Sequence, residues 1–459
     1  MNTRRRLLQA GSTLLLPSLL QACGGSTAPD GIAPPPAPRN GPRGVHLSWT
    51  GDPRKTRTVT WFTDAVDDAP GVVEFGHDGG PMQIATATTE AAFDVPVTTH
   101  RATMKGFDPA RPLRYRVRNG AATSPDFIVK PTPVDRFRFA HFGDHGRTVY
   151  ARAVREGILR RGSDFFVIAG DLSYADGNQP VWDDWFNQME HLAAQVPMMC
   201  CPGNHEDKDG TGAAFRTRFS HPGRSETFYS FDVGRVHLMV STGGALITDG
   251  TLPAELVKIE TDLATAALRR AAGEIDFIVF LQHFTIWTDE EGRSPANPTL
   301  VLLEENIMLR YGVDLLLVGH DHSYQRSQPM GLGLPLPFGY VQVCAGGGGQ
   351  GMRTFDGFSA WSQVQQRRYS FVEYAVEPGR IVATTYAVDD GEDGPPTSDL
   401  SVIDEFELTP RPGIARHEAV KPIRDFQAIL ADAGAHWRYV EAHTKLRNAQ
   451  HLHQALWHG

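Results

Sequence analysis

Five short blocks between residues 143 and 322 carry the side chains that could do chemistry. They are Gly-Asp-His-Gly at 143–146, Gly-Asp-Leu-Ser-Tyr at 170–174, Gly-Asn-His-Glu at 203–206, Gln-His at 282–283 and Gly-His-Asp-His at 319–322. Together they offer carboxylates, a phenol, an amide and several imidazoles, which are common metal ligands. This inventory suits two adjacent ions rather than one. It predicts metal-assisted hydrolysis of a phosphate ester.

The candidate ligands divide into anionic and neutral donors. The anionic ones are Asp144, Asp171 and Tyr174, and the neutral ones are Asn204, His283, His320 and His322. A phenol has a pKa near 10, so ligation by Tyr174 at neutral pH requires a strongly Lewis-acidic ion and favours ferric iron. The neutral donors suit a divalent first-row metal. We expect a hydroxide bound by the two ions to attack the phosphorus in line.

Two further histidines are candidates for contact with substrate. His205 follows Asn204 and should face the cavity, where it could donate to a phosphate oxygen or act as a general acid. His145 could reach substrate or simply cap its loop. A single Gly-Asp or Gly-His pair is most often a turn after a strand. The prediction therefore depends on all five blocks occurring together.

The elements around the blocks predict an α/β fold. Each block follows an apolar run typical of a buried strand, and these runs alternate with helical stretches. The expected strands are 137–142, 164–169, 196–201, 275–281 and 313–318, and the expected helices are 150–161, 181–195, 253–271 and 298–311. Strands at 340–344, 369–376 and 380–388 should complete the sheet. Ligands collect at the carboxyl ends of strands in such sheets, which is where the blocks lie.

The glycine-rich stretch 346–351 formally matches a dinucleotide-binding fingerprint. A helix should follow such a fingerprint, but Met-Arg-Thr-Phe-Asp-Gly follows here, so we interpret the stretch as a tight turn.

The chain of 459 residues is long enough for more than one domain. Residues 44–130 contain short alternating strands separated by Gly, Pro and Asp turns, which is typical of a small β-sandwich. We divide the chain into an export signal (1–22), a tether (23–41), the sandwich (42–131), a catalytic domain (132–410) and a helical carboxyl-terminal extension (411–459).

The amino terminus resembles a bacterial export signal. Three arginines at 4–6 precede a short apolar stretch, as in twin-arginine signals. The ending Leu-x-x-Cys resembles a lipobox, so Cys23 is the expected lipidated residue; an ordinary cleaved signal is the alternative. We therefore expect a protein of the bacterial periplasm or cell surface that meets the membrane only through a lipid at Cys23.

The charge balance bears on the expected partners. The net charge of -9 becomes -12 once the three leader arginines are removed, because the leader holds no acidic residue. This balance argues against nucleic acid as a partner. A small phosphate ester is the expected partner. Its negative charge is compatible with an acidic chain because bound metal ions dominate the charge of their own site. The oligomeric state is left open.

Three more cysteines, Cys200, Cys201 and Cys344, lie in or at the ends of apolar runs. Buried strand thiols are the simpler interpretation. A bridge between Cys344 and one of the pair is the alternative in an exported protein.

The pattern resembles the purple acid phosphatases, within the calcineurin-like metallophosphoesterases. The residue that distinguishes this family is Tyr174 in Gly-Asp-Leu-Ser-Tyr. The resemblance implies a four-layer α/β/β/α sandwich preceded by a fibronectin-type-III-like sandwich. It also implies which residues would hold each ion. The ferric ion would take Asp144, Tyr174 and His322, the divalent ion (iron, zinc or manganese) would take Asn204, His283 and His320, and Asp171 would bridge them.

The chain departs from this family after His283. Plant-type members carry further histidines there, which help to bind substrate and protonate the leaving group, whereas here no histidine occurs until His320. Asp289, Glu290 or Glu291 could replace them as an acid. The leading hypothesis is an exported phosphomonoesterase, and the alternative is a phosphodiesterase or nucleotidase at the same centre. A third hypothesis is a surface binding protein whose metal site is vestigial.

Overall fold

The computed structural model describes residues 41–64, 70–92, 95–224, 228–243, 252–331 and 334–410. The expected export signal, most of the tether with Cys23, and the helical extension at 411–459 lie outside the described residues. Within the described ranges, no helix has the length and apolar character needed to cross a membrane.

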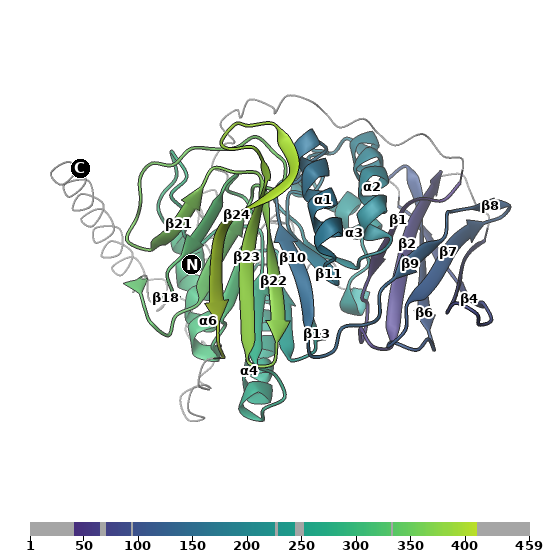
Figure 1. Cartoon of the computed structure of the whole chain (residues 1–459), viewed down its shortest axis with the longest axis horizontal. Helices are drawn as coiled ribbons and strands as arrows, with labels where there is room; N and C mark the ends of the chain where they lie inside the picture. Colours follow the sequence, from purple (N-terminus) through teal and green to yellow (C-terminus); the bar gives the residue numbers. More distant parts are fainter. Residues whose placement is uncertain are drawn as a thin grey trace, which may run out of the picture.

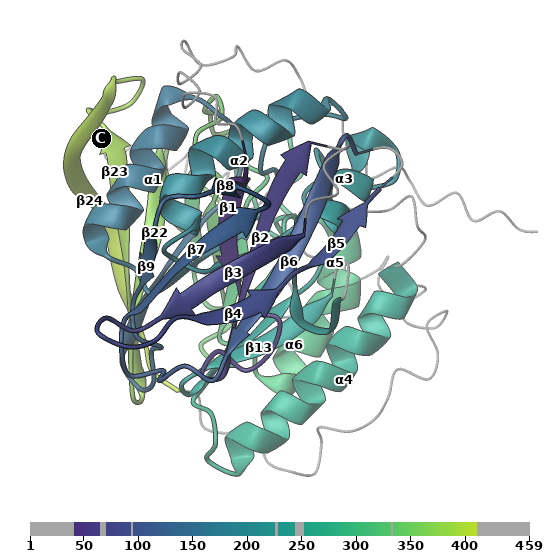
Figure 2. The ribbon, with the colours of Figure 1, turned by 90° about the vertical axis from the view of Figure 1, so that its right-hand side faces the viewer.

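The amino-terminal part is a β-sandwich of two antiparallel sheets (Figure 2). One sheet has the order β1 (Arg43–Ser48), β2 (Thr56–Asp64), β6 (Val97–Lys105), β5 (Thr88–Ala91). The other has the order β4 (Gln83–Thr86), β3 (Gly71–Gly76), β7 (Leu113–Asn119), β8 (Ala122–Thr123), with β9 (Phe127–Val129) also paired to β7. Alternate residues of both sheets, such as Val59, Trp61, Val73 and Tyr115, form its core.

Two larger sheets form the second part of the chain (Figure 1). The first has the order β12 (Met198–Cys201), β11 (Phe165–Ala169), β10 (Phe137–Phe142), β22 (Ser370–Glu377), β23 (Arg380–Asp389), β24 (Pro396–Leu408). The second has the order β13 (Tyr229–Val233), β14 (Val236–Val240), β15 (Phe277–Leu281), β16 (Leu315–Val318), β20 (Val341–Ala345), β17 (Tyr324–Ser327), β21 (Ser362–Gln366). The strands after residue 340 are thus divided between two sheets. The short strands β18 (Met330–Gly331) and β19 (Leu334–Pro335) pair as a separate two-stranded antiparallel sheet.

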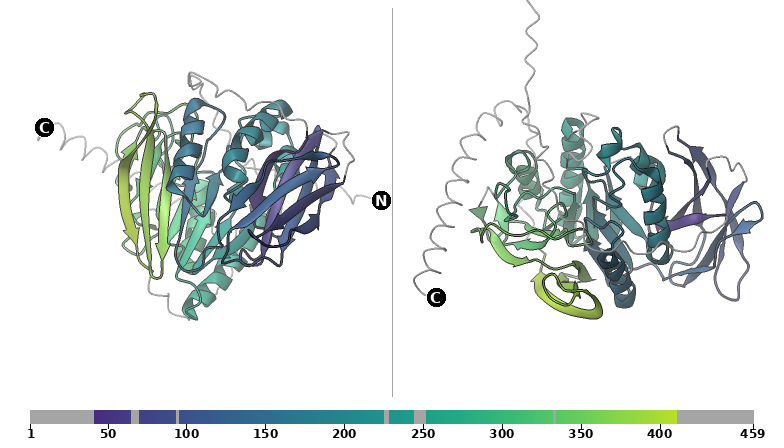
Figure 3. Two further views of the ribbon diagram at one scale, coloured as in Figure 1. Left: turned by 45° about the vertical axis from the view of Figure 1, so that its right-hand side comes forward. Right: turned by 90° about the horizontal axis from the view of Figure 1, so that it is seen from above.

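Side-chain alternation on these strands produces four layers. On β11, Phe165 and Val167 pack between the two sheets, whereas Phe166 and Ile168 face helices. These helices are α1 (Val149–Arg161) and α2 (Gln179–Ala193), seen over the first sheet in Figures 1 and 3. The outward residues of the second sheet pack instead on α4 (Leu252–Ala271) and α6 (Asn306–Tyr311). The order is therefore helix, sheet, sheet, helix, as expected.

The expected helices and strands occur, with small shifts at their ends. The helix expected at 298–311 is divided into α5 (Pro298–Leu300), a π-helical turn η4 (Val301–Glu305) and α6. A short helix α3 (Ala213–Arg218) and two 3-10 turns, η1 (Asp207–Asp209) and η2 (Pro222–Arg224), follow β12. The amino-terminal sandwich shares a buried contact with the second part, since Trp49 packs on Phe165 with ring centroids 5.1 Å apart.

The five blocks follow β10, β11, β12, β15 and β16. Strands β10, β11 and β12 are parallel to one another, and so are β15 and β16. Parallel strands bring their carboxyl ends to one edge of a sheet. The two sheets also meet there, because His283 Nδ1 lies 2.7 Å from the carbonyl oxygen of Ala169. The fold therefore brings all five blocks to one place.

Candidate metal centre

The backbone is strained at the expected ligands. Four of them adopt a left-handed conformation, which non-glycine residues rarely adopt: Asp144 (φ 56°), Asp171 (φ 51°), Tyr174 (φ 55°) and His320 (φ 70°). Such strain costs of order 1–3 kcal/mol per residue and clusters at functional sites. It turns each chain segment sharply after its strand, so that the side chain faces the junction of the two sheets.

One group of donors consists of Asp144, Tyr174 and His322. The phenol oxygen of Tyr174 lies 3.1 Å from Asp144 Oδ1 and 3.0 Å from His322 Nε2. His322 Nε2 lies 3.4 Å from the same carboxylate oxygen. These are the three residues that the family resemblance assigns to a ferric ion.

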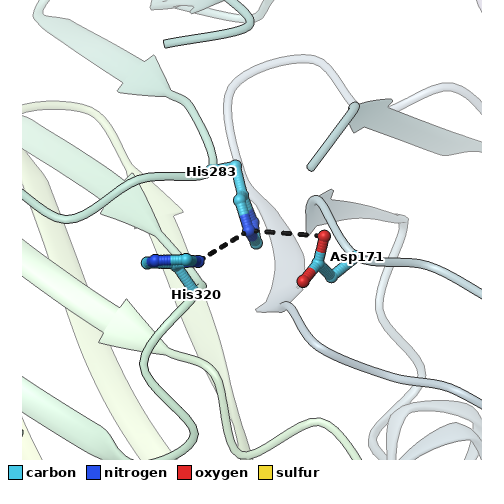
Figure 4. A group of neighbouring side chains, drawn as sticks. All are labelled: Asp171, His283 and His320. Carbon is cyan, nitrogen blue, oxygen red and sulfur yellow. Dashed lines mark hydrogen bonds and ion pairs between the residues drawn. The ribbon is translucent and has the colours of Figure 1, made fainter. Parts of the chain in front are cut away.

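The second group surrounds His283, whose side chain is completely buried. Its Nε2 lies 3.1 Å from Asn204 Oδ1, 3.2 Å from His320 Nδ1 and 3.4 Å from Asp171 Oδ1. Figure 4 shows the contacts of Asp171, His283 and His320, whose ligand atoms all lie within 4.8 Å of one another. The structure thus brings together all seven residues named from the sequence.

Backbone carbonyl groups orient two of the imidazoles. Nδ1 of His283 lies 2.7 Å from the oxygen of Ala169, and Nδ1 of His322 lies 2.8 Å from the oxygen of Gly351. Each Nδ1–H therefore donates to a carbonyl, so that in the neutral imidazole Nε2 is the nitrogen that can bind a cation. Gly351 ends the glycine-rich stretch, so a carbonyl group of this stretch orients one of the candidate metal ligands.

Backbone amides orient the two carboxylates. His320 N–H donates to Asp144 Oδ2 at 2.7 Å, and His205 N–H donates to Asp171 Oδ1 at 2.8 Å. Glycine is required beside Asp171, since a Cβ on Gly203 would collide with Asp171 Oδ1. Each carboxylate is thus fixed by a loop that carries another candidate ligand, His320 for Asp144 and Asn204 for Asp171.

The electrostatics of this site favour cations. Burial would raise the pKa of Asp171, but the nearby His283 and His205 outweigh burial and hold the pKa below its usual range. Burial together with the charges of Asp144 and Asp171 raises the pKa of Tyr174 well above its usual value. A phenolate at this position therefore needs strong positive charge beside it.

The donor set fits two first-row metal ions. Ligands about 2.0–2.2 Å from one ion are themselves about 3 Å apart, and the donor atoms of both groups show such separations. Buried carboxylates, neutral imidazole nitrogens with oriented tautomers and a phenol are the ligand types that these ions use.

Glu206, the last residue of the third block, holds two ligand loops together. Its buried carboxylate accepts three backbone N–H groups, from Asp171 at 2.9 Å, Leu172 at 3.0 Å and Gly203 at 2.7 Å. Glu206 is visible in the sequence as part of the third block. The backbone N–H groups that it binds can be identified only in the folded structure, where the two loops are adjacent.

His205 lies at the rim of the site. Its ring centroid is 4.2 Å from that of Tyr174, and its Nδ1 lies 2.5 Å from Asp176 Oδ1. Lys208 Nζ lies 3.2 Å from Nε2. Neither Asp176 nor Lys208 was predicted from the sequence, although both are only a few residues from predicted site residues. The proximity of Asp176 to His205 accompanies a left-handed backbone at Asp176 (φ 50°).

The structure does not support the prediction that His145 reaches substrate. Its side chain is completely buried. Trp185 Nε1–H donates to Nδ1 at 3.0 Å, and Nε2 lies 3.1 Å from the carbonyl oxygen of Ala151. Both ring nitrogens therefore serve packing between the loop and helices α1 and α2. This agrees with the alternative in which the residue supports its loop.

Asp289, Glu290 and Glu291, the acids that could replace the missing histidines, each contact another residue in the structure. Glu290 is buried and paired with Arg293 at 2.7 Å, and Asp289 is buried and accepts the N–H of Ser359 at 3.1 Å. Glu291 accepts from Thr354 instead. Two residues of this loop contact ligand residues: Glu290 Oε2 accepts the N–H of His322 at 3.2 Å, and Arg293 Nη1 lies 2.6 Å from His320 Nε2.

Cys200, Cys201 and Cys344 are all free and buried. The simpler interpretation, buried thiols, describes them in this structure.

Comparison with known proteins defines the class first. Residues 137–324 match the calcineurin-like phosphoesterase family, and residues 42–130 match the purple acid phosphatase amino-terminal domain. The chain has the mixed α/β metallophosphoesterase fold, preceded by an all-β domain, and it is a phosphoric ester hydrolase.

Named relatives then specify the family. The chain is 30% identical over 327 residues to acid phosphatase type 7 of Mus musculus, covering 63% of this chain and 71% of that protein. It is 27% identical over 330 residues to purple acid phosphatase 22 of Arabidopsis thaliana, covering 68% and 73%. The chain belongs to the purple acid phosphatase family, which implies a dinuclear metal centre.

Solved structures agree on the fold. A purple acid phosphatase from yellow lupin seeds superposes with a TM-score of 0.70 at 22% identity, covering 85% of this chain and 76% of that one.

Proposed function

We propose that this protein is an exported phosphatase that hydrolyses phosphate monoesters at a mixed iron–divalent centre. The observation that carries the proposal is the convergence of seven donor side chains from five strand ends. Asp144, Tyr174 and His322 form one group, and Asn204, His320 and Asp171 surround His283 in the other.

The two groups have different chemistry. Asp144, Tyr174 and His322 include the phenol, so this group would hold ferric iron, while Asn204, His283 and His320 would hold iron, zinc or manganese as the divalent ion. Asp171 would be a ligand of both ions. When bound, the pair of ions polarises the phosphate and lowers the pKa of water toward neutrality.

The side chains of this protein position the ester and its protons. His205 at the rim would donate to a phosphate or leaving-group oxygen, with Asp176 holding its Nδ1 at 2.5 Å. Asp144 and Asp171 hold fixed orientations because backbone amides bind them. Glu206 keeps the two loops that carry Asp171 and Asn204 at a constant separation.

The alternative is a phosphodiesterase or nucleotidase, favoured by the absence of histidine from residues 284–319. Hydrolysis of 4-nitrophenyl phosphate and its bis-ester by the metal-loaded protein separates the two. We expect a higher kcat/KM for the monoester. A clear preference for the bis-ester would favour the alternative, and turnover of neither ester would contradict both.

Export is proposed from the leader alone, with Cys23 as the lipidated residue. Fractionation of cells that produce the full chain tests it, because a lipid-anchored protein should sediment with membranes.

A further inference from the structure

Arg293 is held firmly beside the metal centre by its loop. The loop is closed at its base by a hydrogen bond from Asn297 N–H to the oxygen of Ile286 at 2.7 Å. Near its tip, Gly292 N–H donates to Asp356 Oδ2 at 3.0 Å, and Arg293 N–H donates to the oxygen of Glu290 at 3.1 Å. The side chain of Arg293 is 18% exposed. It therefore reaches the site from a fixed backbone and retains access to solvent.

One role of Arg293 is to neutralise buried acids. Its Nε lies 2.7 Å from Glu290 Oε1 and 3.2 Å from Asp321 Oδ1, and both carboxylates are almost completely buried. A guanidinium is not deprotonated in proteins, so the side chain of Arg293 is permanently charged.

One terminal nitrogen of Arg293 contacts a candidate metal ligand. Nη1 lies 2.6 Å from His320 Nε2, whereas the opposite ring nitrogen of His320, Nδ1, faces His283. An arginine that only neutralised Glu290 and Asp321 would not need to extend toward a ligand of the metal centre.

The contact between Arg293 and His320 depends on which ring nitrogen carries the proton. Nη1 can only donate, so the contact is a hydrogen bond only while Nε2 accepts. A neutral imidazole that binds a cation through Nδ1 carries its proton on Nε2. Both groups are then donors that converge on one position, and an anionic oxygen is the acceptor that satisfies both.

We propose that Arg293 binds the phosphate group of the substrate and favours monoesters over diesters. This inference rests on the proposed function and specifies a residue that determines its substrate class. A monoester offers three non-bridging oxygens and up to two negative charges, whereas a diester offers two oxygens and one charge. A charged donor outside the metal ligands therefore contributes more to a monoester.

The test compares Arg293→Met with the wild type. Isothermal titration of the metal-loaded proteins with inorganic phosphate gives Kd without turnover, and metal analysis confirms equal loading. We expect phosphate binding to weaken by about 10- to 100-fold, as for the loss of a hydrogen bond to a charged group. The kcat/KM for 4-nitrophenyl phosphate should fall by a similar factor. That for the bis-ester should fall by about threefold or less, because the arginine contributes little to a diester.

Arg326→Met is the matched control. Arg326 is also partly buried and paired with a carboxylate, Asp404, at 2.6 Å. The Arg326→Met substitution should lower thermal stability without changing the affinity for phosphate. Arg293→Lys keeps the charge and should recover part of the affinity. Arg293→Gln removes the charge, and it replaces Arg293→Met in every comparison if that variant does not fold.

Two results would overturn the inference. One is phosphate affinity in Arg293→Met, or in Arg293→Gln where it replaces that variant, within about twofold of the wild type. The other is an equal fall in kcat/KM for the two esters. A wild type that binds phosphate but hydrolyses neither ester would contradict the proposed function. The comparison of Kd values would still decide whether Arg293 binds phosphate.

Discussion

Replacement of Glu206 by glutamine should weaken both the fold and the metal centre. The carboxylate accepts N–H groups from Asp171 and Gly203 on Oε2 and from Leu172 on Oε1. Glutamine can place its oxygen toward only one of these sides. Its amide nitrogen then faces an N–H donor on the other side, so at least one buried N–H loses its acceptor.

The magnitude follows from these contacts. An unsatisfied buried donor costs about 1–3 kcal/mol. Burial and the charge of Asp171 raise the pKa of Glu206 to about 8, so above that pH the remaining hydrogen bonds also lose the assistance of the negative charge. We therefore expect Glu206→Gln to destabilise the protein by about 2–4 kcal/mol above pH 8. Groups that orient metal ligands typically change metal affinity by about 10- to 100-fold when mutated, and Glu206 orients the loop that carries Asp171.

The assay is thermal unfolding of the metal-free protein together with competition for metal against a chelator. Glu373→Gln is the control, because Glu373 is a buried carboxylate paired with Arg161 at 2.6 Å on a strand that carries no ligand. It should lower stability and leave metal affinity unchanged. Wild-type metal affinity in Glu206→Gln would refute the positioning role, and wild-type stability would refute the hydrogen-bond argument.

Three further predictions concern other parts of the chain. Burial would lower the pKa of His237, but hydrogen bonds to Asp232 and Asp262 raise it to about 9. The pair of contacts should therefore stabilise the fold by up to about 3 kcal/mol below pH 6.5, and this stabilisation should be lost as the pH rises through 9. Unfolding of His237→Gln and of the wild type across this pH range checks the prediction. A difference in stability that does not depend on pH would contradict it. His205→Ala should lower kcat for 4-nitrophenyl phosphate by about 10²-fold or more while metal content stays constant; unchanged kcat would remove it from the mechanism. Cys23→Ser should move the protein from the membrane fraction to the soluble fraction, and no change in fractionation would contradict lipid anchoring.

The metal ligands could be predicted from the sequence because each one follows an apolar strand. Strand ends are recognisable from local pattern, and parallel strands place their carboxyl ends together whatever the details of packing. Asp144, Asp171 and His283 illustrate this, since each lies two residues beyond a strand. The same reasoning predicted the α/β fold.

The surroundings of the ligands could not be predicted in this way. His145 follows a ligand directly, but the left-handed turn at Asp144 sends it into the core, and no local pattern shows that turn. Arg293 reaches His320 across a loop whose path is set by contacts with residues such as Asp356. Such contacts between distant segments are not visible in residue spacing, so the outer part of the site required the structure.

Metal analysis with a visible spectrum tests the central claim most directly. The purified, oxidised protein should contain two metal ions per chain, at least one of them iron. It should absorb in the visible through charge transfer from the phenolate of Tyr174, and Tyr174→Phe should abolish the band. A colourless, iron-free protein with full phosphatase activity would contradict the ferric assignment, and full activity with at most one metal ion per chain would contradict the two-metal centre.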